Sequence, residues 1–236
     1  MIELPGVKRV PRTARASQAG YTYHVLNRGN ARAEVFHKPG DFSAFLQVID
    51  ESSVRLPMGL LAFCLMPNHF HLVVRPHADG DLSRWMQWLL TTHVRRYVKH
   101  HGHSGHVWQG RFKAFPIQDD DHLVTVVRYV ERNPLRANLV TRAEDWPWSS
   151  LGTSRAGIAA APKLASEELL RRGDWTEFVN APMTEAEAAA IQQSIRRDRP
   201  FGSETWTRIT AERLGLESSL RSPGRQRRQE KVNQTS

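Results

Sequence analysis

The sequence predicts an α+β fold in which a four-stranded antiparallel sheet is backed by helices on one face, a ferredoxin-like layout. Short apolar runs alternate with segments whose apolar residues recur every three or four positions, in the order β-α-β-β-α-β-α. Two of the apolar runs are separated only by a turn, which is typical of an antiparallel hairpin. With 236 residues, 40% of them hydrophobic, the chain can bury a substantial core.

The first part of the domain reads as a strand, a helix and a hairpin. Residues 21–27 (YTYHVLN) are rich in aromatic and β-branched types and run into a turn, so a strand is expected there. From Asp41, apolar residues recur at helical spacing and predict a helix over 41–53. The runs 58–65 and 69–74 then predict two strands around a tight turn.

The second part continues with a helix, a strand and a helix. Residues 82–99 carry an apolar helical stripe, and 111–117 (RFKAFPI) predict the fourth strand. Acidic residues at 119–121 then favour a helix start, and Pro134 should end that helix. Residues 141–150 are expected to wrap the domain. Further helices are expected at 163–172, 184–196 and 203–215.

Several classes of protein are disfavoured by composition. A single cysteine, Cys64, excludes a disulfide framework and a cysteine-rich zinc site. No apolar run approaches the roughly 18–20 residues of a membrane span, and the first 20 residues lack the apolar stretch of a secretory signal. A cytoplasmic protein without membrane contact is therefore expected.

The charge of the chain favours an anionic partner. Of the formal net charge of +9, residues 1–20 contribute +3 and residues 221–236 contribute +4. Residues 84–115, which look folded, carry six basic residues and no acid. Basic tails alone often serve solubility, but a basic folded segment in addition favours nucleic acid.

The first candidate for chemistry is the strand segment HFHLVV. Strand side chains alternate between faces, so His69 and His71 point the same way, and two such imidazoles can share a divalent ion. Two solvent-facing histidines, or a structural hydrogen bond, explain the same pattern equally well.

The second candidate lies on the last helix of the domain. Tyr129 and Asn133 are four residues apart and share one helical face. A metal that polarises a phosphate would make attack by a tyrosine feasible, and an amide oxygen is an acceptable ligand for Mg²⁺ or Mn²⁺. Taken alone, Tyr129 also fits an ordinary core or surface aromatic residue.

The third candidate is the segment 105–113, GHVWQGRFK. It mixes an aromatic face suited to base stacking with cations suited to phosphates. A turn whose Trp108 packs on the core explains the same composition.

Four segments in this order, YHVLNRGN, LMPNHFHLVV, GHVWQGRFK and RYVERNPLRANLV, resemble the REP-associated tyrosine transposases. These are relatives of the single-tyrosine transposases of small bacterial insertion sequences, within the HUH nuclease superfamily. The resemblance covers about residues 20–150. It implies that His69, His71 and Asn133 bind Mg²⁺ or Mn²⁺ and that Tyr129 is the nucleophile.

The resemblance also implies an activity and a partner. The activity is cleavage and rejoining of single-stranded DNA through a 5′-phosphotyrosine, and the partner is hairpin DNA formed by repetitive palindromes. No P-loop is present, and none is needed because the covalent link conserves the bond energy. The residues expected to bind DNA are Arg28, Asn30, Arg95, Arg96, Lys99, Trp108, Arg111, Lys113, Arg225, Arg227 and Arg228.

The expected organisation has four parts: a basic segment over 1–20, the transposase domain over 21–150, a helical extension over 151–220 and a disordered basic tail over 221–236. Either a monomer or a homodimer fits. A non-catalytic protein that binds structured DNA is the main alternative. A metal-dependent hydrolase built on His100, His101, His103 and His106 is a third reading, disfavoured because that Gly-rich link has no acidic partner nearby in sequence.

Overall fold

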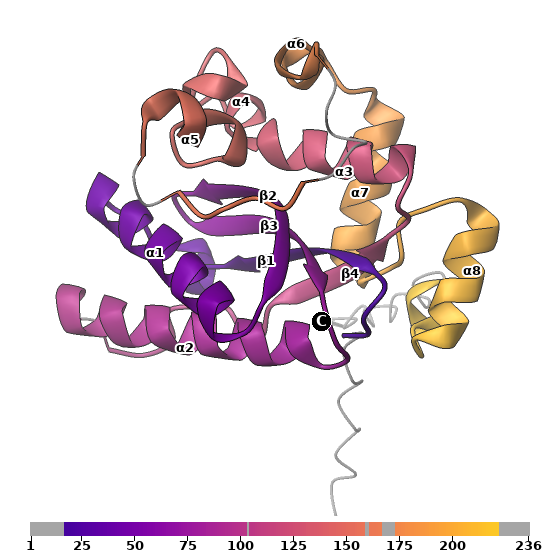
Figure 1. The fold of residues 1–236 in the computed structure, drawn as a ribbon, viewed down its shortest axis with the longest axis horizontal. Coiled ribbons are helices and arrows are strands. Elements are labelled where there is room, and N and C mark those ends of the chain that lie inside the picture. Colours follow the sequence, from indigo (N-terminus) through magenta and orange to yellow (C-terminus); the bar gives the residue numbers. More distant parts are fainter. Residues whose placement is uncertain (1–16, 103, 159–160, 167–172, 222–236) are drawn as a thin grey trace, which may run out of the picture.

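A four-stranded antiparallel sheet lies at the centre of the computed structural model, which describes residues 17–102, 104–158, 161–166 and 173–221 (Figure 1). The strand order β2-β3-β1-β4 confirms the expected α+β class and ferredoxin-like sheet. The strands are β1 (Thr22–Arg28), β2 (Met58–Met66), β3 (His69–Pro76) and β4 (Lys113–Ile117).

Helices cover both faces of this sheet, whereas the sequence predicted helices on one face only (Figure 1). Helices α1 (Pro39–Arg55) and α2 (Asp81–His101) pack on one face, and α3 (Asp121–Glu131) packs on the other. The reason is visible in β3, where Phe70 and Leu72 join the core under α1 and α2 while Val73 joins the core under α3. Because both faces of the strand are apolar, both need a cover.

Helix α3 begins and ends as its sequence indicates. The side chain of Asp120 caps it by accepting a hydrogen bond from the His122 backbone N–H at 2.8 Å. The helix ends at Glu131, shortly before Pro134. A further helical turn, α4 (Asn133–Arg136), follows with Pro134 in its first turn, where a missing N–H costs nothing. Because α4 begins so soon after α3, Tyr129 on α3 and Asn133 on α4 can lie on the same side of the two helices.

The segment after α4 wraps the domain as expected. The Leu65 backbone N–H donates to the Trp148 carbonyl and the Trp146 indole N–H donates to the Leu65 carbonyl, both at 2.8 Å, so the segment packs on β2. Short 3-10 turns lie at Asn30–Arg32, Ala143–Asp145 and Glu217–Ser219.

The helices of the extension are α5 (Ser150–Ala156), α6 (Trp175–Asn180), α7 (Glu185–Arg197) and α8 (Glu204–Arg213). Two of the three helices predicted for this region are present as α7 and α8. Residues 163–166 are not helical, and 167–172, the rest of the predicted 163–172 helix, lie outside the described residues.

The extension is fastened to the domain at two places. At the outer edge of the sheet, the Phe201 N–H donates to the Pro116 carbonyl and the Gln118 N–H donates to the Phe201 carbonyl, both at 2.9 Å. On α3, Arg128 donates to the Ala181 carbonyl at 2.8 Å, and Arg132 donates to the Val179 carbonyl at 2.9 Å. The helix that carries Tyr129 is thus held from both sides of that residue.

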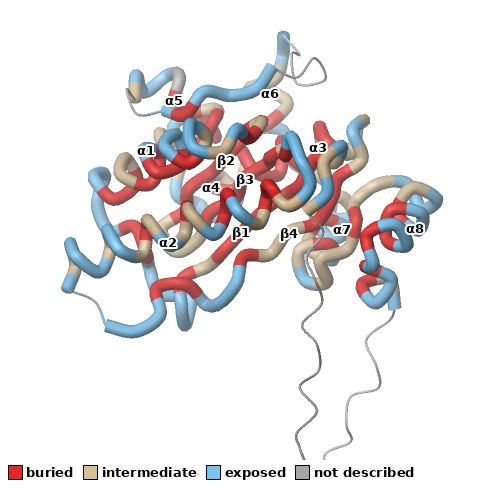
Figure 2. The backbone as a smooth tube through the Cα atoms, turned by 60° about the horizontal axis from the view of Figure 1, so that its bottom comes forward, coloured by how far each residue is buried: buried red, intermediate tan, exposed pale blue. Residues whose placement is uncertain are grey.

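The buried residues lie in the sheet and on the sides of the helices that pack against it (Figure 2). The strands are almost wholly buried, whereas the helices bury one side and expose the other. Within the described residues, no helix combines the length and the apolar character that crossing a bilayer demands. Residues 1–16 of the predicted basic N-terminal segment (1–20) lie outside the described residues, as do Arg225, Arg227 and Arg228 of the predicted tail.

Candidate active site

His69 and His71 lie side by side near the start of β3. Their ring centres are 5.0 Å apart, on the face of the sheet opposite the buried Phe70. The Nδ1 atom of His69 bonds to the Asn68 side-chain oxygen at 2.6 Å, and Nδ1 of His71 bonds to Nε2 of His24 at 2.9 Å. With Nδ1 of each ring engaged, Nε2 of each ring is the nitrogen left for a metal ion.

Tyr129 reaches this pair from α3. Its ring centre lies 6.0 Å from that of His71, with the two ring planes at 89°. Asn133 follows one turn later, and its side-chain N–H donates to the Tyr129 carbonyl at 2.8 Å. The structure therefore brings together His69, His71 and Tyr129, and Asn133 contacts the backbone of Tyr129.

Asn133 is already engaged through both ends of its amide. Its oxygen accepts a hydrogen bond from Nη2 of Arg136 at 2.9 Å, and an amide oxygen carries a second lone pair that could face a metal ion. The guanidinium of Arg136 also lies over the Tyr129 ring, 4.9 Å from its centre. Arg136 thus links the proposed third ligand to the proposed nucleophile.

Two residues of this constellation, His24 and Arg136, were not predicted from the sequence. His24 lies on β1 and is fully buried, with its ring stacked 5.0 Å from that of His71. Strand register places it there, and register cannot be read from a short motif. Arg136 could have been found, because Tyr129, Asn133 and Arg136 follow a helical spacing that continues past Pro134.

Burial sets the protonation of the histidines. It lowers the pKa of His24 to about 3 and the pKa of His69 to about 4, with the charges of Arg28 and Arg136 acting in the same direction on His69. Burial also lowers the pKa of His71 well below its ordinary value. All three rings are therefore neutral at pH 7, the form that binds a metal.

Burial has the opposite effect on the tyrosine. It raises the pKa of Tyr129, while the positive charges of Arg136 and Arg28 and a hydrogen bond with Arg136 partly counter it. The two arginines therefore favour the phenolate form of Tyr129.

A basic cleft of about 550 Å³ opens beside this centre. Arg28, which faces His69 across the β1–β3 register, lines it together with Arg111 and Lys113. The ammonium of Lys113 donates to the Ile195 and Arg196 carbonyls at 2.9 and 3.1 Å, so it joins α7 to the wall of the cleft. Asn30, also expected to bind DNA, is exposed just after β1.

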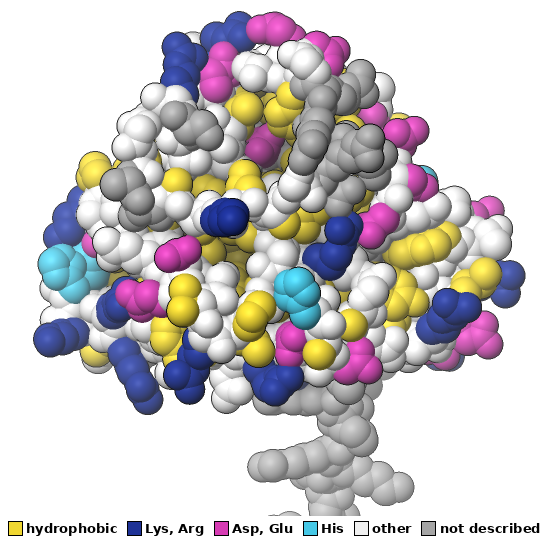
Figure 3. All heavy atoms as spheres, in the orientation of Figure 1, with side chains coloured by type: hydrophobic (Ala, Val, Ile, Leu, Met, Phe, Trp, Pro, Cys, Tyr) yellow, Lys and Arg dark blue, Asp and Glu magenta, His cyan; other side chains and the backbone are white. Residues whose placement is uncertain are grey.

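The other basic residues expected to bind DNA form a separate surface. Arg95, Arg96 and Lys99 are exposed on α2, across the sheet from Tyr129. Arg96 is paired with the carboxylate of Glu51 at 2.8 Å. Figure 3 shows lysine and arginine side chains, with acidic ones between them, spread over the region of α2.

Trp108 is not placed to stack on a base. It is 6% exposed, and its ring packs against Phe70 at 5.3 Å and His93 at 5.2 Å in the core under α1 and α2. The expectation that it binds DNA is therefore wrong, and the alternative of a core tryptophan is correct. The basic residues of the same segment, Arg111 just before β4 and Lys113 at its start, still line the basic cleft.

Comparisons with known proteins found a family and similar proteins. The model of the family described as "Transposase IS200 like" matches residues 17–133, about half of the chain. A Haemophilus influenzae protein assigned to the REP-associated tyrosine transposases is 28% identical over 117 residues, which are 45% of this chain and 66% of that protein, just under two thirds of its length. The REP-associated tyrosine transposase of Escherichia coli is 27% identical over 135 residues, 56% of this chain and 77% of that protein.

A solved structure shows the same fold. It is the structure of a REP-associated tyrosine transposase bound to a REP hairpin, with a TM-score of 0.52 and 21% identity. The match covers 69% of this chain and 98% of that one. That structure shows the fold, and the family model shows that the chain belongs, over residues 17–133, to the IS200-like transposase family.

Proposed function

We propose that the protein is a metal-dependent transposase that cleaves and rejoins single-stranded DNA beside a hairpin through a 5′-phosphotyrosine. The observation that carries this proposal is the convergence of His69, His71 and Tyr129 on one face of the sheet, with 6.0 Å between the rings of His71 and Tyr129. The relative solved with a REP hairpin supports the class of substrate.

The site offers two imidazoles and one amide oxygen to a divalent cation, and the amide oxygen is the ligand that Mg²⁺ or Mn²⁺ accepts most readily. Nε2 of His69 and of His71 would hold it, together with the side-chain oxygen of Asn133. Bound there, the ion would polarise the scissile phosphate. The neutral imidazoles and their engaged Nδ1 atoms fit this use, because a ligand held from behind keeps its orientation.

The chemical step falls to Tyr129. Its phenol loses a proton, and the resulting phenolate attacks phosphorus and forms a new O–P bond. The bond from phosphorus to the 3′-oxygen of the preceding nucleotide breaks, and that oxygen takes up a proton in place of the one the phenol lost, which leaves a 5′-phosphotyrosine and a free 3′-hydroxyl. Attack by that hydroxyl, or by one from another strand, reverses the step. Arg136 and Arg28 stabilise the phenolate, and Arg136 also steadies Asn133.

The basic cleft supports the choice of a single strand. Arg28 and Arg111 line it next to the candidate centre, so a backbone that passes along the cleft presents its phosphates to cations before it reaches Tyr129. A buried tyrosine, 3% exposed, requires a substrate that can be splayed into the site. Paired duplex DNA lacks that freedom.

We expect a labelled DNA hairpin with a single-stranded flank to be cut in Mg²⁺ or Mn²⁺, and the same sequence as a full duplex to stay intact. A denaturing gel measures both the cut strand and the protein–DNA adduct. Binding should weaken steeply with salt because counterions are released from the phosphates. Equal cutting of both substrates would contradict the proposal, and hairpin binding without cutting would support a purely DNA-binding role.

Replacement of His24 with Phe tests the support behind His71. The change keeps an aromatic ring beside Phe115 but removes the nitrogen that bonds to His71 at 2.9 Å. We expect Mn²⁺ affinity to fall by about 10- to 100-fold, the usual effect of losing a partner behind a metal ligand. Titration of Mn²⁺ followed by electron paramagnetic resonance measures this without DNA. Unchanged affinity would show that His71 does not need His24 for its orientation.

A further inference from the structure

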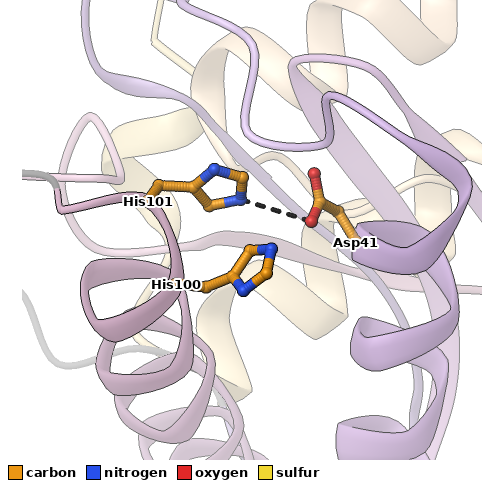
Figure 4. A group of neighbouring side chains, drawn as sticks. All are labelled: Asp41, His100 and His101. Carbon is orange, nitrogen blue, oxygen red and sulfur yellow. Dashed lines mark hydrogen bonds and ion pairs between the residues drawn. The ribbon is translucent and has the colours of Figure 1, made fainter.

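The histidine-rich segment after residue 99 has the acidic partner that the sequence did not reveal. Helix α2 continues through His101, so His100 and His101 lie in its last turn. Asp41, in the first turn of α1, faces them (Figure 4). Sixty residues separate the carboxylate from His101, and only the packing of α1 against α2 brings the two together.

We propose that Asp41, His100 and His101 form a second metal site for a divalent transition-metal ion of the Zn²⁺ or Co²⁺ type. Two imidazoles and one carboxylate are ligands that such ions prefer over Mg²⁺. The site is independent of the proposed catalytic centre, because α1 and α2 cover the face of the sheet opposite Tyr129.

The spacing of the ligand atoms fits one ion. Nε2 of His101 and Oδ1 of Asp41 are 3.2 Å apart. Metal–ligand bonds of about 2.0–2.2 Å at tetrahedral angles separate two ligands by roughly 3.3 Å, so this pair already has the required distance. A nitrogen of His100 lies within 4.8 Å of both atoms, and because this ring is exposed it can rotate to close the gap.

The carboxylate is held in place for this role. Its other oxygen, Oδ2, accepts the backbone N–H groups of His37 at 2.9 Å and Lys38 at 3.2 Å. The side chain is 8% exposed, so Oδ1 is directed at His101 by a fixed, nearly buried group. A ligand whose orientation is fixed beforehand loses little entropy when the ion binds.

The surroundings provide space and a favourable backbone charge. A cavity of about 470 Å³ lies over the three residues and leaves room for water to complete the coordination. The last turn of a helix carries a partial negative charge from its free carbonyls, which favours a cation beside His100 and His101.

One neighbour competes with the ion. The ammonium of Lys38 lies 2.6 Å from Nε2 of His100 and occupies that nitrogen with a hydrogen bond. Lys38 is exposed, so its long side chain can leave towards solvent when a metal binds. Because the metal ion must displace the Lys38 ammonium from His100, we expect removal of the lysine to strengthen metal binding.

The test is a Co²⁺ titration of the full-length protein, followed by the visible absorption that Co²⁺ gains when imidazole binds it. We expect two bound ions in the unaltered chain and one in the variant His69→Ala, which lacks a ligand of the catalytic centre. His100→Ala or His101→Ala, introduced into His69→Ala, should weaken the remaining site by at least about tenfold. Asp41→Asn should weaken the site by a similar factor, whereas the amide oxygen of the asparagine can still accept the backbone N–H groups at the start of α1. Lys38→Met should tighten binding.

The matched control is His106→Ala, which removes an exposed histidine outside the cluster and should leave Co²⁺ binding unchanged. His100 is exposed, so its loss does not threaten folding, and a thermal melt without metal verifies this for every variant. The proposal is overturned if His100→Ala and His101→Ala leave both the stoichiometry and the affinity unchanged. If the proposed catalytic centre is the wrong one, the unaltered chain binds a single ion that His69→Ala retains and His101→Ala loses.

Discussion

The variant Tyr129→Phe should lose both strand cleavage and the covalent protein–DNA adduct. The change removes one oxygen, and the proposed covalent link needs that oxygen. We expect cleavage to fall by at least about a thousandfold, the scale on which loss of a catalytic nucleophile acts. Folding should survive, because the hydrogen bond between the hydroxyl and the charged Arg136 side chain is worth about 1.5–3 kcal/mol, less than the roughly 5–15 kcal/mol that stabilises a typical domain. A denaturing gel with labelled hairpin DNA measures cleavage and adduct together.

Tyr97→Phe is the matched control. Tyr97 lies on α2, on the other side of the sheet, and its hydroxyl also makes one hydrogen bond, to His37 at 2.9 Å. Both variants therefore lose the same atom and a similar contact. Adduct formation by Tyr129→Phe but not by Tyr97→Phe would move the nucleophile to the other tyrosine. If neither change mattered, the single-tyrosine mechanism would fail for this protein.

Mild acid should destabilise the metal-free protein. Burial lowers the pKa of His24 and His93 to about 3, that of His69 to about 4 and that of His71 well below its ordinary value. The unfolded chain binds protons at these rings below about pH 6.5, whereas the folded chain resists them, so stability decreases as the pH is lowered. Between pH 6 and pH 5 each ring costs roughly 1 kcal/mol. Four such losses are a large share of the roughly 5–15 kcal/mol that stabilises a typical domain.

Urea unfolding at a series of pH values, with a chelator present, measures this slope. The variant His93→Leu should lose about a quarter of it, because His93 is one of four buried rings and lies in an aromatic core, where its Nδ1 has no hydrogen-bond partner among the described residues. His106→Leu, at an exposed position, should retain the full slope. A free energy of unfolding that does not change between pH 7 and pH 5 would show that the buried rings bind protons as readily in the folded chain as in the unfolded one.

Local patterns were enough to predict most of the sheet and the pairing of His69 with His71. Alternation along β3 requires the two rings to share a face, and helical spacing requires Tyr129 and Asn133 to do so. Neither rule says which face of the sheet α3 covers. That choice depends on how the apolar side chains of all four strands are shared between two layers, which only the assembled sheet determines.

His24 and Asp41 could not be predicted for the same reason. His24 contacts His71 through strand register, and Asp41 contacts His101 through the packing of two helices, so both pairs join positions far apart in the chain. Trp108 was misjudged for a related reason. A tryptophan beside arginines suits a stacking platform as well as a core, and its surroundings in three dimensions decide between them.

The hydrogen bonds that hold the extension to α3 and β4 limit which segment of such a protein can be exchanged by gene fusion. Arg128 and Arg132 flank the tyrosine and bond to carbonyls near the end of α6, and Phe201 closes the open side of β4. A gene fusion that kept only residues 17–136 would carry every proposed catalytic group, Arg136 included. It would also leave two arginines without their acceptors and a bare strand that invites aggregation. The unit that recombination can exchange is therefore longer than the unit that performs the chemistry.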